Sequence, residues 1–590
     1  MSKEILKRVR GMYEHSRKSA QYREWRNQCE KASRYYEGDQ WTEQEKQTLR
    51  ERGQPAITIN LIAPKIDALA GTEIQGRTKI AYRSRTFDEV DEQMAKGLSS
   101  LAMNVQERTD LTRKSSMAFE DCLVKGIGWL ELDHEGPDIT AEHVNPYEMG
   151  WDVDDETPFL TDSMYVWREK WVDLSEAKLT WPDAAAKLQR YVSQFADDEP
   201  GGMVTQSVPG DDYDTEDAKQ LHYVDPKRDK VRLVEVQYKK AATKYRYISK
   251  IDNRQREVFD KSEARKNKAE DTDVSEIKGY KVLSAYFVGD ILLQHLPLRT
   301  QTGNFLYIPL PYKRRSDGVF YGPVYAAIDP QDEYNKRRSK LMHLLNTNQL
   351  IITGDAHQDI RELQAMAARP DGVIHIAEGA TIDIRNNLNL AQGQFQIMQQ
   401  AAQEIQQAMG IYDELLGQET NATSGIAVTR RQQASVRTQG PAFDRLSWHK
   451  KAIGRSLLAL MQAVLPENTT ALILGEDQRE LQGQITLNET YKDTDGNKYV
   501  KHDVQATEFD VYVEEIPDFN APPEELANSI KEIVMNGQLQ LLAQAPSLMK
   551  QMGIRNVDQV VKEIQAAQPA APDATASPAQ PGAAPTSIAG

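Results

Sequence analysis

Two helical segments on either side of a non-helical stretch constrain this fold more than any other feature of the sequence. Asp329 can cap a helix and Pro330 suits a first turn, so we expect a helix over residues 326–348. A second helix is expected over residues 394–416, where apolar side chains follow a helical period. The stretch between them holds two strand-like runs and a turn signal, at residues 350–353, 372–376 and 370–372.

One face of the second helix is apolar at positions i, i+3, i+4 and i+7. This stripe consists of Met398, Ala401, Ala402, Ile405, Ala408, Met409 and Tyr412. The other faces are mostly glutamine, and Glu404 is the only charge before Asp413. The stripe predicts packing, within the chain or against a neighbouring copy, and its alanines allow a close approach.

A polar loop between two glycines follows the second helix. It comprises Gly417, Gln418, Glu419, Thr420, Asn421, Ala422, Thr423, Ser424 and Gly425. A third helix is expected from residue 424 to about residue 465, with a kink at Gly440–Pro441.

The third helix is strongly basic although the chain is acidic. The chain has 72 Lys and Arg against 88 Asp and Glu, a net charge of −16, so it is no general coat for nucleic acid. The helix carries one acid, Asp444, and the bases Arg430, Arg431, Arg437, Arg445, Lys450, Lys451 and Arg455. A solvated face and an electrostatic role toward nucleic acid or a neighbouring subunit both remain open.

The rest of the 590 residues alternates helix and strand signals, which predicts an α+β fold. Helices are expected over residues 1–36, 61–75, 88–125 and 522–564, and from Thr42, where Glu45 completes a capping box. Strands are expected over 80–85, 129–133, 139–144, 231–238 paired with 244–249, and 280–288 joined to 291–296 by Gly289–Asp290. Further expectations are a solvated loop over 196–217, strands within 470–516 and a disordered Ala/Pro-rich tail over 565–590.

The motifs of the common catalytic sites do not occur. The sequence has no G-x-x-x-x-G-K-[ST], H-E-x-x-H or G-x-S-x-G pattern. A run of carboxylates can bind a hard cation or form an exposed acidic turn, and we favour the turn at Asp152, Asp154, Asp155 and Glu156. Only Cys29 and Cys122 are present, which excludes a disulfide framework and fits a reducing compartment. We expect no cofactor and no metal.

Neither secretion nor membrane insertion is expected. The N-terminal residues lack the apolar segment of a signal peptide. The longest uncharged apolar run, residues 456–465, is about half of the ~20 residues that a membrane helix needs.

A set of short motifs is specific by its order along the chain. They are Arg34-Tyr-Tyr-Glu-Gly-Asp-Gln-Trp41, Leu49-Arg-Glu-Arg-Gly-Gln-Pro55, Ile57-Thr-Ile-Asn-Leu61, Gln75-Gly-Arg77, Tyr321-Gly-Pro323, Asp329-Pro-Gln-Asp-Glu-Tyr-Asn-Lys-Arg-Arg-Ser339, Pro370-Asp-Gly-Val-Ile374, Thr423-Ser-Gly-Ile-Ala427 and Phe509-Asp-Val-Tyr-Val-Glu514. Together they resemble the head-to-tail portal proteins of short-tailed bacteriophages, over about residues 30–565.

This resemblance implies an elongated protomer with named parts. Its wing would comprise residues 1–320 and 466–519, and its stem the helices within 321–348 and 394–416. The remaining parts would be a small α/β clip at 349–393, a channel loop at 417–425, a long kinked helix at 426–465, a crown at 520–564 and a tail at 565–590.

The resemblance also implies a non-enzymatic role and a set of partners. Copies of the chain, usually twelve, would form a ring at one capsid vertex, with assembly in the host cytoplasm. Double-stranded DNA would pass through the ring, and the terminase large subunit, a tail adaptor, and the major capsid and scaffolding proteins would dock on it. Two competing functions are a metal-dependent nucleic-acid hydrolase that uses residues 151–156, and a helical scaffold without a pore.

Within this scheme, seven cations are candidates for contacts with DNA or with a neighbouring subunit, and we slightly favour the neighbour. They are Lys336, Arg337, Arg338, Lys340, Arg430, Arg431 and Arg437. Residues 417–425 are expected to move and to narrow the channel. Met398, Ala402, Ile405 and Met409 are expected to pack the helices.

Overall fold

The structure of the protein, a computed structural model, describes residues 2–85, 88–194, 223–225, 227–250, 255–270, 272–298, 300, 303–346, 348–353, 360–367, 373–374, 381–386, 388–411, 438–474, 481–492, 498–504 and 509–515. The chain divides into two compact units, residues 1–514 and 515–590. Only residue 515 of the second unit is described, so the expected helix at 522–564 and the expected tail lie outside the described residues.

Helices and strands are both abundant, which confirms the α+β class. The helices are α1 (Ser2–Lys18), α2 (Ala20–Glu37), α3 (Glu43–Glu51), α4 (Ala63–Gln75), α5 (Glu89–Arg108), α6 (Leu111–Lys125), α7 (Leu174–Thr180), α8 (Ala185–Ser193), α10 (Lys261–Asn267), α11 (Pro323–Asn346), α12 (Ile360–Ala367), α13 (Leu388–Met409) and α15 (Gly440–Val464), with 3-10 turns η1 (Pro146–Glu148) and η2 (Pro182–Ala184).

The strands are β1 (Thr78–Ser84), β2 (Ile127–Glu135), β3 (Asp138–Val144), β4 (Met149–Trp151), β5 (Tyr165–Asp173), β6 (Val224–Asp225), β7 (Lys230–Ile248), β8 (Gln255–Val258), β9 (Ser275–Val288), β10 (Ile291–Pro297), β11 (Tyr307–Pro311), β12 (Lys313–Arg314), β13 (Phe320–Tyr321), β14 (Asn348–Thr353), β15 (Thr381–Asn386), β16 (Thr469–Leu474), β17 (Leu481–Leu487), β18 (Glu489–Lys492), β19 (Lys498–Lys501) and β20 (Phe509–Glu515).

The N-terminal helix expected over residues 1–36 is two helices. Ser19 ends α1 and caps α2, because its side chain accepts a hydrogen bond from the Tyr22 amide. Gly38 then ends α2 with φ 92°, a left-handed conformation that suits glycine. The expected capping box of α3, between Thr42 and Glu45, is confirmed.

The helix expected over residues 88–125 is also divided. Asp88 caps α5 as its side chain accepts from the Val90 amide. The break comes after Thr109, where Asp110 has φ 52°. Asp is one of the few residues that enter the left-handed region readily, so the turn occurs without glycine or proline to mark it in the sequence.

The largest sheet runs in the order β10-β9-β7-β5-β4, with β6 and β8 also paired to β7. Its strand β7 is continuous from Lys230 to Ile248, so the expected pairing of 231–238 with 244–249 is wrong. These runs lie end to end and pair with β9 instead. The hairpin of β9 and β10 around Gly289 is confirmed.

An aromatic core joins this sheet to α1 and α2. Tyr13 meets Trp167 edge-on at a ring distance of 4.8 Å, and Trp25 meets Trp151 at 5.0 Å. All four side chains are buried. The aromatic residues of the N-terminal helices therefore fix those helices against β4 and β5.

A second sheet, β11-β2-β3, packs close to α6. Gly128 of β2 permits this approach, since a Cβ there would lie 1.8 Å from the Ala118 carbonyl oxygen. A further core cluster combines residues of 80–141, 306–308, 453–461 and 471–509. Strand β1 pairs with β20, so the C-terminal strands lie with the N-terminal part of the chain.

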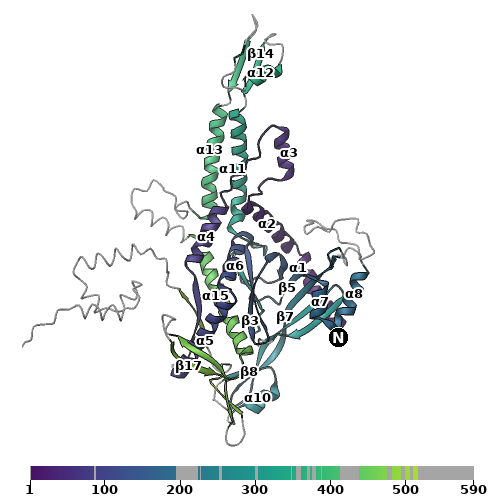
Figure 1. Cartoon of the computed structure of the whole chain (residues 1–590), viewed down its shortest axis with the longest axis vertical. Coiled ribbons are helices and arrows are strands. Elements are labelled where there is room, and N and C mark those ends of the chain that lie inside the picture. The colour runs from purple at the N-terminus through teal and green to yellow at the C-terminus, as the bar shows by residue number, and fades with distance from the viewer. Residues whose placement is uncertain are drawn as a thin grey trace, which may run out of the picture. The chain divides into compact units, whose positions relative to one another are not determined.

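Helices α11 and α13 lie side by side (Figure 1). The expected start of α11 is wrong: the helix begins at Pro323, Asp329 is exposed within it, and Pro330 lies in its interior. Pro323 suits the first turn of a helix, and Gly322 before it lies so close to α6 that a Cβ there would be 2.1 Å from the Leu123 carbonyl oxygen.

Between these helices, β14 pairs antiparallel with β15 at residues 381–386, and α12 lies in the sequence between them. The strand expected at 350–353 is therefore present, but its partner comes later than the second run, 372–376. Of that run only residues 373–374 are described, and neither is in a strand. The turn signal at 370–372 and the loop expected over 196–217 lie outside the described residues.

Candidate functional site

Helices α11 and α13 are held together by a small apolar cluster. Leu341 of α11 packs with Ala391 and Met398 of α13, and Tyr334 and Leu344 lie against the cluster. The Arg337 guanidinium also donates to the Gln394 side-chain oxygen across 3.3 Å.

The remaining stripe residues of α13 face a larger core. Ile405 and Met409 are buried in a cluster that includes Ile62, Phe119 and Val324. Ala402 is half-buried. Met398, Ile405 and Met409 thus pack within this protomer, as predicted, whereas Ala408 of the stripe is exposed and Tyr412 lies outside the described residues.

The opposite face of α13 is exposed and almost free of charge. Its apolar members are Leu390, Phe395 and Ile397, which are 61%, 44% and 37% exposed. Exposed glutamines separate them, at Gln392, Gln396, Gln399, Gln400, Gln403 and Gln407. Glu404, the one ionisable side chain from Leu388 to Met409, accepts a hydrogen bond from Gln400 at 2.8 Å.

The four predicted cations of α11 differ in their surroundings. Lys336 pairs with Glu45 at 3.1 Å and with Asp332 at 3.7 Å, and Arg337 pairs with Glu333 at 3.0 Å. Burial opposes the charge on Lys336, but the hydrogen bond to Glu45 prevails and raises its pKa. Arg338 and Lys340 are half-buried and make no ion pair among the described residues.

The cations of the third helix are only partly described. Arg430, Arg431, Arg437 and the loop 417–425 lie outside the described residues, as does the helix expected before residue 438. Helix α15 begins at Gly440 with Pro441 in its first turn. Its Lys450 is buried and pairs with Glu73 at 3.2 Å, so this cation does not face solvent.

An extended segment, residues 55–61, runs along α11 and is called the strap. The amides of Ile57, Ile59 and Leu61 donate to the side chains of Ser339, Asn335 and Gln331, each across 3.1 Å. The three strap amides belong to every second residue of an extended chain, a spacing of about 6.6 Å. Their acceptors belong to every fourth residue of α11, a spacing of about 6 Å along the helix. The two spacings match, so each amide meets one acceptor. This polar ladder is buried, since its three α11 side chains are at most 2% exposed.

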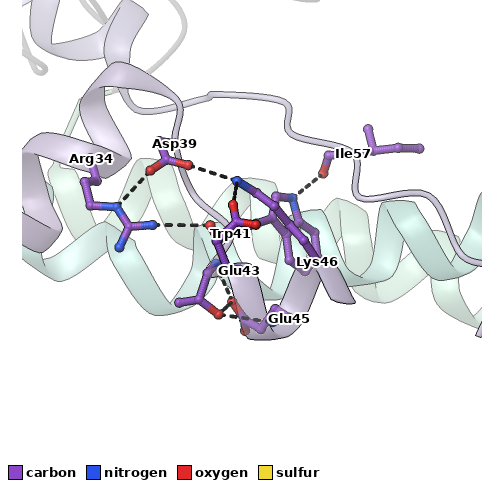
Figure 2. Close-up of polar contacts among 8 residues, drawn as sticks. Arg34, Asp39, Trp41, Glu43, Glu45, Lys46 and Ile57 are labelled. Carbon is purple, nitrogen blue, oxygen red and sulfur yellow. Dashed lines mark hydrogen bonds and ion pairs between the residues drawn. The ribbon is translucent and has the colours of Figure 1, made fainter. Parts of the chain in front are cut away.

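Residues 42–54, which contain α3, form an arm that precedes the strap. Asp39 pairs with Arg34 at 3.0 Å and with Lys46 at 3.5 Å, and these contacts fix the start of the arm (Figure 2). The buried Trp41 donates its indole N–H to the Ile57 carbonyl across 3.2 Å. The nine-residue helix α3 buries none of its own residues.

The acidic turn uses its carboxylates to hold its own backbone. Asp155 accepts from the Thr157 amide and from the Ser163 hydroxyl, both at 2.6 Å, and Asp152 accepts from the Met164 amide at 3.0 Å. Both are buried, whereas Asp154 and Glu156 are exposed, so the expected exposed turn holds for two of its four carboxylates. Across the described part of the chain, no group of three or more His, Cys, Asp or Glu residues is arranged to hold a metal ion.

A partly buried ionic cluster has no signal in the sequence. Arg168 of β5 pairs with Glu131 at 2.6 Å, Glu142 at 3.0 Å and Glu148 at 3.1 Å. Burial, followed by the charge of Glu235, raises the pKa of Glu131 to about 8. These residues come from β2, β3, η1 and β5, and β5 belongs to a different sheet from β2 and β3, so only the packing of the whole fold brings them together.

One comparison with known proteins gives a match. The model of the phage P22-like portal protein family matches residues 12–587, nearly the whole chain. No curated protein matches the chain. No helix within the described ranges is both long and apolar enough to cross a bilayer.

Proposed function

The chain belongs to the phage P22-like portal protein family, and from this premise we propose that twelve copies form a ring at one capsid vertex. Double-stranded DNA enters and leaves the capsid through this ring, and the motor and tail proteins dock on it. The observation that carries the proposal is the family match over residues 12–587. The family is structural, so the role is that of a conduit and not of an enzyme.

We assign the parts of the protomer by the family's architecture. Helices α11 and α13 are the stem, and residues 349–393 the clip that meets the terminase large subunit and later the tail adaptor. Residues 1–320 and 466–519 are the wing. The pairing of β1 with β20 and the shared apolar core support a wing built from both segments. Residues 520–564 form the crown by the same assignment, which rests on sequence alone.

A DNA conduit must not hold its cargo tightly. Each neutralised phosphate adds to affinity, so several Lys or Arg contacts per subunit, repeated around a ring, would clamp the duplex. The net charge of −16 per chain opposes such binding.

The channel loop is the part of the proposal that a deletion tests best. We expect that removal of residues 417–425 leaves ring assembly intact but lowers the amount of DNA packaged or retained in capsids. The measurement is the DNA content of purified capsids that carry the variant.

A deletion of equal length at residues 202–210, in another polar and glycine-containing segment, is the control and should leave DNA content unchanged. Equal DNA content in the loop variant and the unaltered protein would refute the role of the loop.

A further inference from the structure

The arm is a fixed feature that adds nothing to the protomer's own core. Helix α3 has nine residues and no buried side chain, and a helix this short is not stable alone in water. Yet its capping box, the ion pair of Glu45 with Lys336 and the buried strap hold it in one place. A contact outside the protomer would explain why an exposed helix is held so firmly.

The arm and α13 contact opposite flanks of α11. The strap is held by Gln331, Asn335 and Ser339, whereas Tyr334, Arg337 and Leu341 contact α13. At 3.6 residues per turn, these two sets point roughly 140° apart around the helix. Figure 1 shows α3 and α13 on opposite sides of α11. Copies placed side by side in a ring would therefore bring the arm of one toward α13 of the next.

The two surfaces are also alike in chemistry. The exposed face of α13 carries the glutamines at positions 392, 396, 399 and 403 with Phe395 beside them, whereas Ile397 points about 160° away from Phe395. The outward face of α3 carries the exposed side chains of Gln44, Gln47, Thr48 and Glu51, and the Gln47 amide donates to the Glu51 carboxylate at 3.1 Å. Beside α3 is a cavity of about 390 Å³, lined in part by Trp41, Pro55 and Ala56. Each surface is mainly uncharged and polar, with Glu51 on α3 and the half-buried Glu404 on α13, and the cavity is also lined by the charged side chains of Asp39, Lys46 and Arg50.

We propose that the arm of one copy docks on the exposed face of α13 in the adjacent copy. Such an interface joins two different surfaces, which is what a closed ring of identical chains requires. The proposal rests on the proposed ring, and it identifies the contact that links neighbouring stems. It also gives the exposed side chain of Phe395 a partner.

Cysteine cross-linking tests this contact directly. Thr48→Cys on the arm is combined, one at a time, with Gln392→Cys, Gln396→Cys, Gln399→Cys and Gln403→Cys, which sample three turns of α13. The two native cysteines are buried, which limits background reaction. After mild oxidation of assembled rings, we expect at least one pair to give a ladder from covalent dimers upward on a denaturing gel. Single-cysteine variants can form dimers at most.

The control pairs the same α13 cysteines with Leu179→Cys, a residue of α7 that is 81% exposed and should give no ladder. A second measurement uses the Phe395→Ser variant. The protein concentration needed for half-maximal ring assembly should rise about tenfold or more relative to the unaltered protein. The melting temperature of the variant should equal that of the unaltered protein, which shows that the fold is intact. Rings without a ladder from any pair would overturn the docking contact alone. Failure of the unaltered protein to form rings would instead overturn the proposed function.

Discussion

Lys450 lies in the most basic segment of the sequence, yet its ammonium group is buried against Glu73. Glu73 also accepts a hydrogen bond from the Ser116 hydroxyl at 2.7 Å, so the pair is part of a buried polar network. The next residue toward the N-terminus, His449, is fully buried and its Nδ1 lies 3.0 Å from the Pro309 carbonyl oxygen. At the scale of single residues, charge counted along the sequence therefore overstates the charge available at the surface of α15.

His449 predicts a loss of stability in mild acid. Burial, aided by the charge of Lys450, lowers the pKa of its imidazole to about 4. An unfolded His titrates near 6.5, so between pH 6.5 and about 4 the unfolded chain binds a proton that the native state does not. Stability should fall across this window by up to roughly 3 kcal/mol. Calorimetry can measure the drop in melting temperature from pH 7 to pH 5. This drop should be smaller in the His449→Gln variant than in the unaltered protein.

The exposed residue His15 gives the control: His15→Gln should show the same drop as the unaltered protein. An equal drop in His449→Gln would show that burial of this imidazole does not set the acid response.

At the scale of elements, local signals predicted much of the fold, and long-range contacts account for the rest. The capping box at Thr42 and the turn at Gly289 are local and were predicted correctly. The continuity of β7 depends on its long pairing with β9, and α11 runs through the capping signal at Asp329 and Pro330 that predicted its start. The polar ladder had no sequence signal, because Gln331, Asn335 and Ser339 look like ordinary polar residues of a helix.

The ladder predicts that Asn335 holds the strap in place. Asn335→Leu would leave the Ile59 amide and the Gln40 side-chain oxygen without their partner. Unpaired buried polar groups cost about 1–3 kcal/mol each, so we expect a lower melting temperature and faster hydrogen exchange over residues 55–61. Mass spectrometry of the exchanged peptides measures this.

Lys340→Ala lies on the same helix outside the ladder and should leave the exchange of the strap unchanged. Unchanged exchange in Asn335→Leu as well would show that the ladder does not hold the strap.

At the scale of the whole molecule, the family match and the arrangement of α11 support one account. Helix α11 has α13 on one flank and the strap and arm on the other, so a single helix carries both surfaces through which we propose neighbouring copies meet. A chain with a net charge of −16 fits a passage for DNA better than a site that binds it.

The ring is the central claim, and the most direct test is native mass measured together with electron microscopy of the purified protein. We predict particles with a central hole wide enough for a DNA duplex and a mass near twelve times 66.8 kDa. A compact dimer or tetramer without a pore would contradict the account.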